Sequence, residues 1–264
     1  MCLVAAAALP LGCVAEELRL GATYTLEDSG ILPVLVGAFT RATGIAVRPV
    51  VAGTGQVMKY AENGDVDVVF THSRKDEERL VARGVGTARA DVMWNDFVIA
   101  GPTADPAHVR GERDAAAALK RIRAAGAKFV SRGDDSGTHK KELELWAAGG
   151  GLTPWPLYLS SGQGAGRTLI MANEMDAYDL VDRATLRQMS KRFPLAILVE
   201  GDPRLLNEYG VTTLKPSASR PVRAREGEAF ARWIVSDAAR SIISAYRVEG
   251  ERAFYLPGER RPAR

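Results

Sequence analysis

Short segments rich in glycine and hydroxyl side chains recur along the chain, each between a predicted strand and a predicted helix. The first residues of a helix offer unpaired backbone amides and about half a unit of positive charge, which favour a bound anion. Any one such segment could be an ordinary helix cap. Together, facing one cleft, they predict an anion-binding site. The segments are "TYTLEDSG" (23–30), "AGTGQ" (52–56), "SRGDDSGTH" (131–139) and "SSGQGAGRT" (160–168).

The third segment could instead carry catalysis. Asp134 and Asp135 could form a carboxylate pair for acid–base chemistry, and His139 could activate Ser136. Capping explains one aspartate without catalysis, however, and no serine lies in the G-x-S-x-G pattern of a nucleophile elbow. The tripeptide "RGD" is common by chance, which argues against an adhesion role. The alternative to a binding protein is an enzyme that uses His139 and Asp135 on a phosphorylated or acyl substrate.

Metal and nucleotide sites find little support in the sequence. The three histidines, His72, His108 and His139, lack the spacing of metal ligands. The segment "SSGQGAGRT" is similar to a phosphate-binding loop, but Ser161 stands where its first glycine is required and Arg167 where its lysine is required. We therefore expect no bound metal, no cofactor and no catalytic residues.

The composition is that of an ordinary globular protein. The chain has 264 residues, of which 46% are hydrophobic and 25% charged, and 35 basic against 32 acidic residues give a net charge of +3. Nucleic-acid binding would require a clustered basic face. The one basic cluster, residues 252–264, is interpreted as a solvated tail.

Residues 1–15, "MCLVAAAALPLGCVA", carry no charge and resemble the core of a secretory signal. The small residues Cys13 and Ala15 predict cleavage after Ala15. A lipoprotein with an acylated Cys13 is the alternative, although Pro10 fits that pattern poorly. The expected product is periplasmic or otherwise extracytoplasmic. Both cysteines of the chain lie in this segment, so no disulfide is expected in the mature protein.

Strands and helices alternate along the rest of the chain, which predicts an α/β fold with mostly parallel sheets flanked by helices. The alternation restarts after Pro102, so we expect two lobes, one formed by 16–100 and 207–264 and the other by 101–206. Two chain crossings would make a hinge, with the ligand in the cleft beyond the carboxyl ends of the strands. The expected strands include 18–25, 45–52, 66–72, 94–102 and 209–216, and the expected helices include 31–44, 56–64, 75–84, 114–125 and 139–148.

The order of motifs resembles the tungstate-binding proteins of bacterial ABC importers, from about Thr23 to Phe254. The resemblance implies a two-lobed periplasmic-binding-protein fold of type II that closes over an oxyanion and delivers it to a permease in the inner membrane. It is carried by "EDSG", "AGTG", "NGDVDVV", "NDFVIAGP", "FVSRGDDSGTHKKE", "GQGAGRTL", "AYDLVDR" and "ILVEGD" followed by "YGV".

The same resemblance implies that Arg132 and Thr138 contact the oxyanion. The family carries a run "TTTS" in its first loop, where this chain has Ala22-Thr23-Tyr24-Thr25. The last hydroxyl is kept as Thr25, whereas Ala22 and Tyr24 depart from the family pattern.

Tungstate is a dianion without protons, so its oxygens only accept hydrogen bonds. Arg132 would add a charged fork, or else form a salt bridge with Asp134. An acidic acceptor in the pocket would instead favour hydrogen phosphate, and Asp28, Asp134 and Asp135 are the residues that decide this. Molybdate, sulfate and phosphate are the alternative ligands, a sensor is an alternative role, and a monomer is expected. The predicted donors are the hydroxyls of Thr25, Thr54, Ser136 and Thr138 and the amides of Gly55, Gly137, Gly164 and Ala165.

Overall fold

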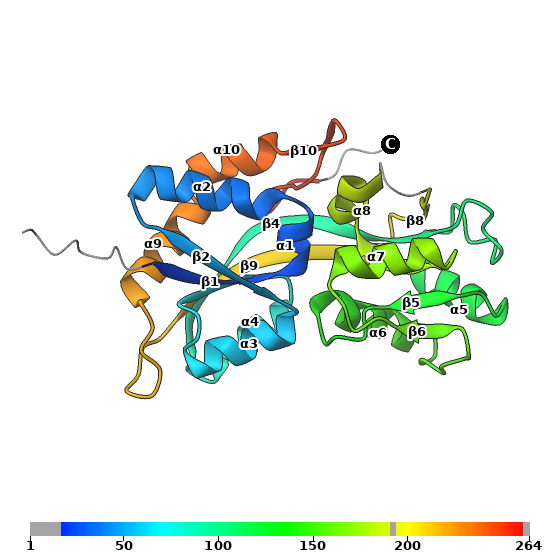
Figure 1. Cartoon of the computed structure of the whole chain (residues 1–264), viewed down its shortest axis with the longest axis horizontal. Coiled ribbons are helices and arrows are strands. Elements are labelled where there is room, and N and C mark those ends of the chain that lie inside the picture. Colours follow the sequence, from blue (N-terminus) through cyan, green and yellow to red (C-terminus); the bar gives the residue numbers. More distant parts are fainter. Residues whose placement is uncertain (1–16, 191–193, 261–264) are drawn as a thin grey trace, which may run out of the picture.

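The structure is a computed structural model, and it describes residues 17–190 and 194–260. The chain forms two lobes that lie side by side and are joined by long strands (Figure 1). The predicted export segment, 1–15, lies outside the described residues. Within the described ranges, no helix combines the length and the hydrophobicity needed to cross a membrane.

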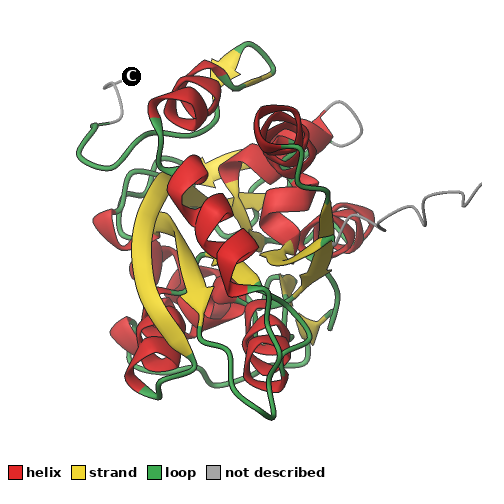
Figure 2. Cartoon of the chain, turned by 90° about the vertical axis from the view of Figure 1, so that its left-hand side faces the viewer, coloured by secondary structure: helices red, strands yellow, loops and turns green. Residues whose placement is uncertain are grey.

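The first lobe is a sheet with helices on both faces (Figures 1 and 2). Successive side chains of a strand point to opposite faces, and both faces of this sheet are buried. Phe70 packs with Phe39 and Phe230 on one face, whereas Val69 packs with Val57 on the other. The elements are β1 (Leu18–Thr23), α1 (Tyr24–Asp28), α2 (Ile31–Thr43), β2 (Val47–Ala52), α3 (Thr54–Asn63), β3 (Val68–Thr71), α4 (Arg74–Ala82), α9 (Ala224–Ile234) and α10 (Asp237–Ala245).

The second lobe repeats this arrangement around shorter strands. Phe129 packs with Trp146 on one side of its strand, and the next residue, Val130, packs with Ala172 on the other. The elements are α5 (Ala115–Ala124), β5 (Phe129–Ser131), α6 (Gly137–Ala148), β6 (Tyr158–Ser160), α7 (Ala165–Glu174), β7 (Asp179–Asp182), α8 (Arg183–Met189), β8 (Ala196–Val199) and η2 (Pro203–Leu205).

The two long strands β4 (Gly86–Gly101) and β9 (Leu206–Leu214) connect the lobes. They pair with each other antiparallel, and β9 also pairs antiparallel with β3, as β4 does with β7 and β8. Mostly parallel sheets were expected, and β1 is indeed parallel to β2 and β3, as β5 is to β6. The expectation is wrong for the pairings of β4 and β9, which are all antiparallel. The reason is that the chain enters the second lobe through one strand and returns through its neighbour. A short hairpin of β10 (Arg247–Val248) and β11 (Glu251–Arg252) follows near the C-terminus.

Candidate functional site

The third glycine-rich segment bends tightly between β5 and α6. Gly133 has a positive φ of 59°, and a Cβ there would overlap Ser160 Oγ, so no other residue fits without rearrangement. Asp135 also adopts a positive φ, 57°. Ser136 is the N-cap of α6, and its Oγ accepts a hydrogen bond from the His139 amide at 3.2 Å. These turns bury Ser136 and Thr138 at the start of α6.

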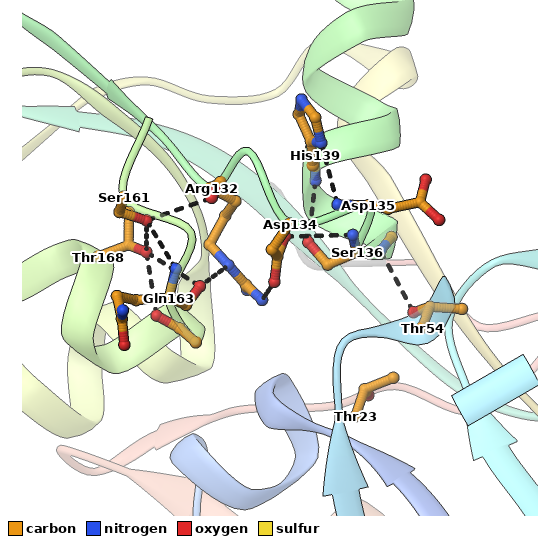
Figure 3. Close-up of polar contacts among 12 residues, drawn as sticks. Thr23, Thr54, Arg132, Asp134, Asp135, Ser136, His139, Ser161, Gln163 and Thr168 are labelled. Atoms are coloured by element: carbon orange, nitrogen blue, oxygen red, sulfur yellow. Dashed lines mark hydrogen bonds and ion pairs between the residues drawn. The ribbon is translucent and has the colours of Figure 1, made fainter. Parts of the chain in front are cut away.

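This segment contacts the 52–56 segment of the first lobe. The Gly137 amide donates to Thr54 Oγ1 at 3.2 Å, and the Gly55 amide donates to the Asp135 carbonyl at 3.3 Å. A Cβ on Gly53 would lie 3.2 Å from Asp134 Oδ2. The N-termini of α3 and α6, which come from different lobes, are thus held against each other (Figure 3).

The first and fourth segments meet in the same way. The Gly166 amide, near the start of α7, donates to Asp28 Oδ2 at 2.9 Å. The Tyr24 ring lies against Gly164, where a Cβ would approach the ring at 3.0 Å. The fourth segment also contacts the third, because Arg132 Nε donates to the Gln163 carbonyl at 2.7 Å. All the glycine-rich segments therefore gather in one region between the lobes.

The predicted hydroxyl donors are all buried in this region. The Thr54 hydroxyl accepts from Gly137 and the Ser136 hydroxyl from His139, so each keeps its own hydrogen free to donate. Thr25 Oγ1 lies 3.1 Å from Thr23 Oγ1. The buried Thr138 hydroxyl has no hydrogen-bond partner among residues 17–190 and 194–260. Such a group is costly unless something else satisfies it.

The predicted amide donors divide into two pairs. Those of Gly55 and Gly137 already donate to groups of the opposite lobe. Gly164 is the N-cap of α7 and Ala165 its first residue, so the latter pair lies where a helix leaves its amides unpaired. Sequence reasoning placed all of these residues at helix starts, but it did not foresee that two of the amides would bridge the lobes.

Arg132 is buried, with 2% of its surface exposed. One of its terminal nitrogens pairs with Asp134 Oδ2, and its Nε donates to the Gln163 carbonyl. Its guanidinium carbon lies 5.8 Å from the centre of the Tyr24 ring. The salt bridge that the sequence offered as an alternative role for Arg132 is thus present in the structure. These contacts fix the guanidinium inside the region where the segments meet (Figure 3).

The acidic residues of the third segment have distinct surroundings. Asp134 uses one carboxylate oxygen for Arg132 and the other for the Ser136 amide, at 3.1 Å. The Asp135 side chain is 71% exposed and lies 3.5 Å from Lys140 Nζ. The His139 ring accepts a hydrogen bond from the Asp135 backbone amide rather than pairing with its carboxylate. The acid–base pair of the enzyme hypothesis is therefore not assembled in this structure.

Two buried acids of the second lobe, Asp179 and Glu142, have raised pKa values. Burial raises the pKa of Asp179 well above its ordinary value, and the neighbouring Glu142 raises it further, while Arg132 acts in the opposite sense. Burial also raises the pKa of Glu142, although hydrogen bonds from Ser131 and Tyr158 oppose that effect. Both shifts favour the neutral form of these carboxyl groups and so reduce their repulsion of an anion near Arg132.

Sequence reasoning gave no site role to several residues that the structure places here. Thr23, Tyr24 and Gln163 all contact predicted site residues. Thr23 and Tyr24 lie in the loop where the family run of threonines stands, which was the available signal. Nothing in the sequence pointed to the Gln163 carbonyl.

A family model described as a PBP superfamily domain matches residues 14–238 of the chain. The chain belongs to the PBP superfamily. This PBP-superfamily chain is 44% identical over 232 residues to the tungstate-binding protein TupA of Peptoclostridium acidaminophilum, covering 87% of this chain and 81% of that protein.

Solved structures agree with this membership. A crystal structure described as the tungstate ABC transporter from Geobacter sulfurreducens matches with a TM-score of 0.80 and 41% identity, over 88% of this chain and 99% of that one. The tungstate-binding protein TupA from Desulfovibrio alaskensis G20 matches with a TM-score of 0.76 and 40% identity, over 93% of this chain and 100% of that one. The chain thus belongs to the same family as these TupA proteins. The resemblance predicted from the motifs is confirmed, as is the two-lobed fold.

Proposed function

We propose that this chain is an extracytoplasmic solute-binding protein that captures tungstate and delivers it to an ABC importer. The observation that carries the proposal is the meeting, between the lobes, of helix N-termini and buried hydroxyls from both halves of the molecule. Such an array matches a small anion that accepts hydrogen bonds and offers none. The names of the relatives identify tungstate as the anion to test first.

The proposed contacts are the hydroxyls of Thr25, Thr54, Ser136 and Thr138, the guanidinium of Arg132, and the amides at the start of α7. Among them Thr138 has the strongest support, because its buried hydroxyl has no other partner in the described part of the chain. In this proposal the Gly55 and Gly137 amides align the two lobes, because both already donate hydrogen bonds across the cleft.

The upper part of the free-energy range that these contacts supply reaches what tight binding requires. Roughly six hydrogen bonds to a charged ligand, at ~1.5–3 kcal/mol each, give about 9–18 kcal/mol before costs. Nanomolar affinity requires ~12 kcal/mol, and ordering the ligand and closing the lobes consume part of the total.

The hydrogen bonds of Asp134 favour a proton-free anion over hydrogen phosphate. A phosphate site needs a carboxylate with an oxygen free to accept the proton of the ligand. Both oxygens of Asp134 already accept from Arg132 and Ser136, whereas Asp28 accepts from the α7 backbone through Oδ2 alone. The exposed Asp135 side chain lies beside Lys140. Molybdate has the same charge and shape as tungstate, and it belongs to the same proposal.

The remaining features of the proposal follow from this role. The protein acts without catalysis, as a monomer outside the cytoplasm, with the importer permease as its partner. The lobes divide near residues 100 and 206, so that β4 and β9 form the hinge between them.

Isothermal titration calorimetry of the purified protein with tungstate, molybdate, sulfate and phosphate tests the proposal. We expect submicromolar binding of tungstate, with or without molybdate, and much weaker binding of sulfate and phosphate. Absence of binding heat with both tungstate and molybdate would reject the proposed function. Preferential binding of phosphate would replace it with the phosphate-binding alternative.

A further inference from the structure

Helix α1 presents two side chains, one helical turn apart, to the opposite lobe. Tyr24 and Asp28 are four residues apart and therefore lie on the same face of α1. Both contact the start of α7, at Gly164 and Gly166 respectively. We propose that Tyr24 and Asp28, here called the α1 clasp, hold the closed state together and slow the release of the oxyanion. This inference rests on the proposed function and adds positioning residues to it.

The Asp28 contact supplies a cap that α7 lacks within its own lobe. Helices α5, α6 and α8 of the second lobe are each capped by a side chain from the residue before them, namely Asp114, Ser136 and Asp182. The N-cap of α7 is Gly164, which has no side chain to offer. The hydrogen bond from the Gly166 amide to Asp28 takes its place, and the two residues are separated by 138 positions in sequence. The start of α7 is therefore capped by a side chain only when the lobes are together.

The Tyr24 contact links closure to Arg132. The ring packs so tightly on Gly164 that an added Cβ would lie 3.0 Å from ring carbon Cγ. The guanidinium of Arg132 stands over the same ring, 5.8 Å from its centre. Tyr24 comes from the first lobe and both of its neighbours from the second. Closing the lobes thus places an aromatic surface beside the one arginine in the proposed contact set.

The two clasp residues line a pocket of about 250 Å³ at this seam, together with Glu27, Gln163, Gly164 and Arg167. Glu27 precedes Asp28 on the same short helix and is exposed. No hydrogen bond from Glu27 to the other lobe is present among the described residues. It therefore serves as a matched control, having a similar charge and position without the cross-lobe contact.

The test measures the rate constants of tungstate binding by stopped-flow fluorescence and the radius of gyration of the protein by small-angle X-ray scattering. In Asp28→Ala the dissociation rate should rise about fivefold, in line with the loss of a helix cap, while the association rate changes little. Asp28→Asn keeps an oxygen that can accept from the Gly166 amide, so it should stay close to wild type. Glu27→Ala should leave both rates unchanged.

Tyr24→Ala should also speed dissociation, and Gly164→Ala should do the same from the other lobe, because its methyl group would push against the ring. Equal dissociation rates in wild type, Asp28→Ala and Gly164→Ala would overturn the clasp. So would a full loss of binding in Asp28→Asn, since that variant preserves the hydrogen bond.

Scattering separates failure of the clasp from failure of the proposed function. If wild type binds no tungstate but the ligand-free Asp28→Ala protein is more extended than wild type, the clasp stands and the tungstate role falls. If Asp28→Ala and wild type have the same radius of gyration and wild type binds no tungstate, the clasp falls as well.

Discussion

Replacing Thr138 by valine should make the protein more stable and a poorer oxyanion binder at the same time. Valine has nearly the shape of threonine but lacks the hydroxyl. The hydroxyl of Thr138 is buried and has no protein partner in the described ranges. An unsatisfied buried hydroxyl costs ~1–3 kcal/mol. Removing it should therefore raise the free energy of unfolding by about 1 kcal/mol, which corresponds to ~2–4 °C in the thermal midpoint of a chain of this size.

The same substitution removes a hydrogen bond to a charged ligand. That bond contributes ~1.5–3 kcal/mol, so the dissociation constant for tungstate should rise by about 10- to 150-fold. The opposite signs of the two effects make the result informative, because most single substitutions destabilise a protein.

Thr212→Val is the matched control. Thr212 lies on β9, is fully buried, and also has a hydroxyl without a partner among the described residues. It should gain similar stability with unchanged tungstate affinity. Calorimetric titration and differential scanning calorimetry measure both quantities on the same samples. A Thr138→Val protein that melts lower than wild type and binds tungstate normally would refute the reasoning.

Three further predictions concern His72, Arg132 and Asp67. Burial lowers the pKa of His72 to about 4, below its ordinary 6.5, so the unfolded chain takes up the proton first and stability is lost as pH falls from 6.5 to 4. The loss of unfolding free energy should reach about 3 kcal/mol. Urea unfolding between pH 6.5 and pH 4 measures it. The loss should disappear in His72→Gln and persist in the exposed control His108→Gln. Arg132→Lys keeps the charge but loses the fork that reaches Asp134 and Gln163, so tungstate affinity measured by calorimetry should fall at least tenfold; an unchanged affinity would remove Arg132 from the site. Asp67 is buried and accepts from the side chain of Arg19 at 2.5 Å, so Asp67→Asn should lower the free energy of unfolding by about 2 kcal/mol in urea at pH 7, and no change would show that the pair contributes nothing.

Local signals in the sequence predicted much of the fold correctly. Helix α2 was expected at 31–44 from Pro33 and Gly44 and is found at Ile31–Thr43, with Gly44 in the left-handed conformation that ends a helix. Helix α6 was expected at 139–148 and is found at Gly137–Ala148, where Ser136 is the N-cap. These features depend on residues close together in the chain, and sequence patterns report such features well.

Other elements could not be read from local pattern. Strand β4 begins at Gly86, eight residues before the predicted start at Trp94, because its first half is paired on the sheet by β9 rather than marked by hydrophobic residues. The short helix α1 was included in a predicted strand and loop. The relative direction of β4 and β9 is likewise set by how the two lobes connect.

The candidate site, like the fold, could be predicted only in part from local sequence pattern. The glycine-rich segments identified the helix starts, yet which atoms face one another depends on the closed arrangement of the lobes. Asp28 accepts from a helix amide, but that helix is α7 of the opposite lobe. Contacts between distant segments also determine the partners of Arg132 and the acceptors of the Gly55 and Gly137 amides.

We propose that one tetrahedral anion binds where the glycine-rich segments of both lobes meet. Crystals grown with tungstate, measured at the tungsten absorption edge, test it directly because tungsten gives a strong anomalous signal. We predict a single dominant anomalous peak within hydrogen-bonding reach of Thr54, Arg132 and Thr138. A dominant peak elsewhere on the molecule, or none in crystals that contain tungstate, would contradict the claim.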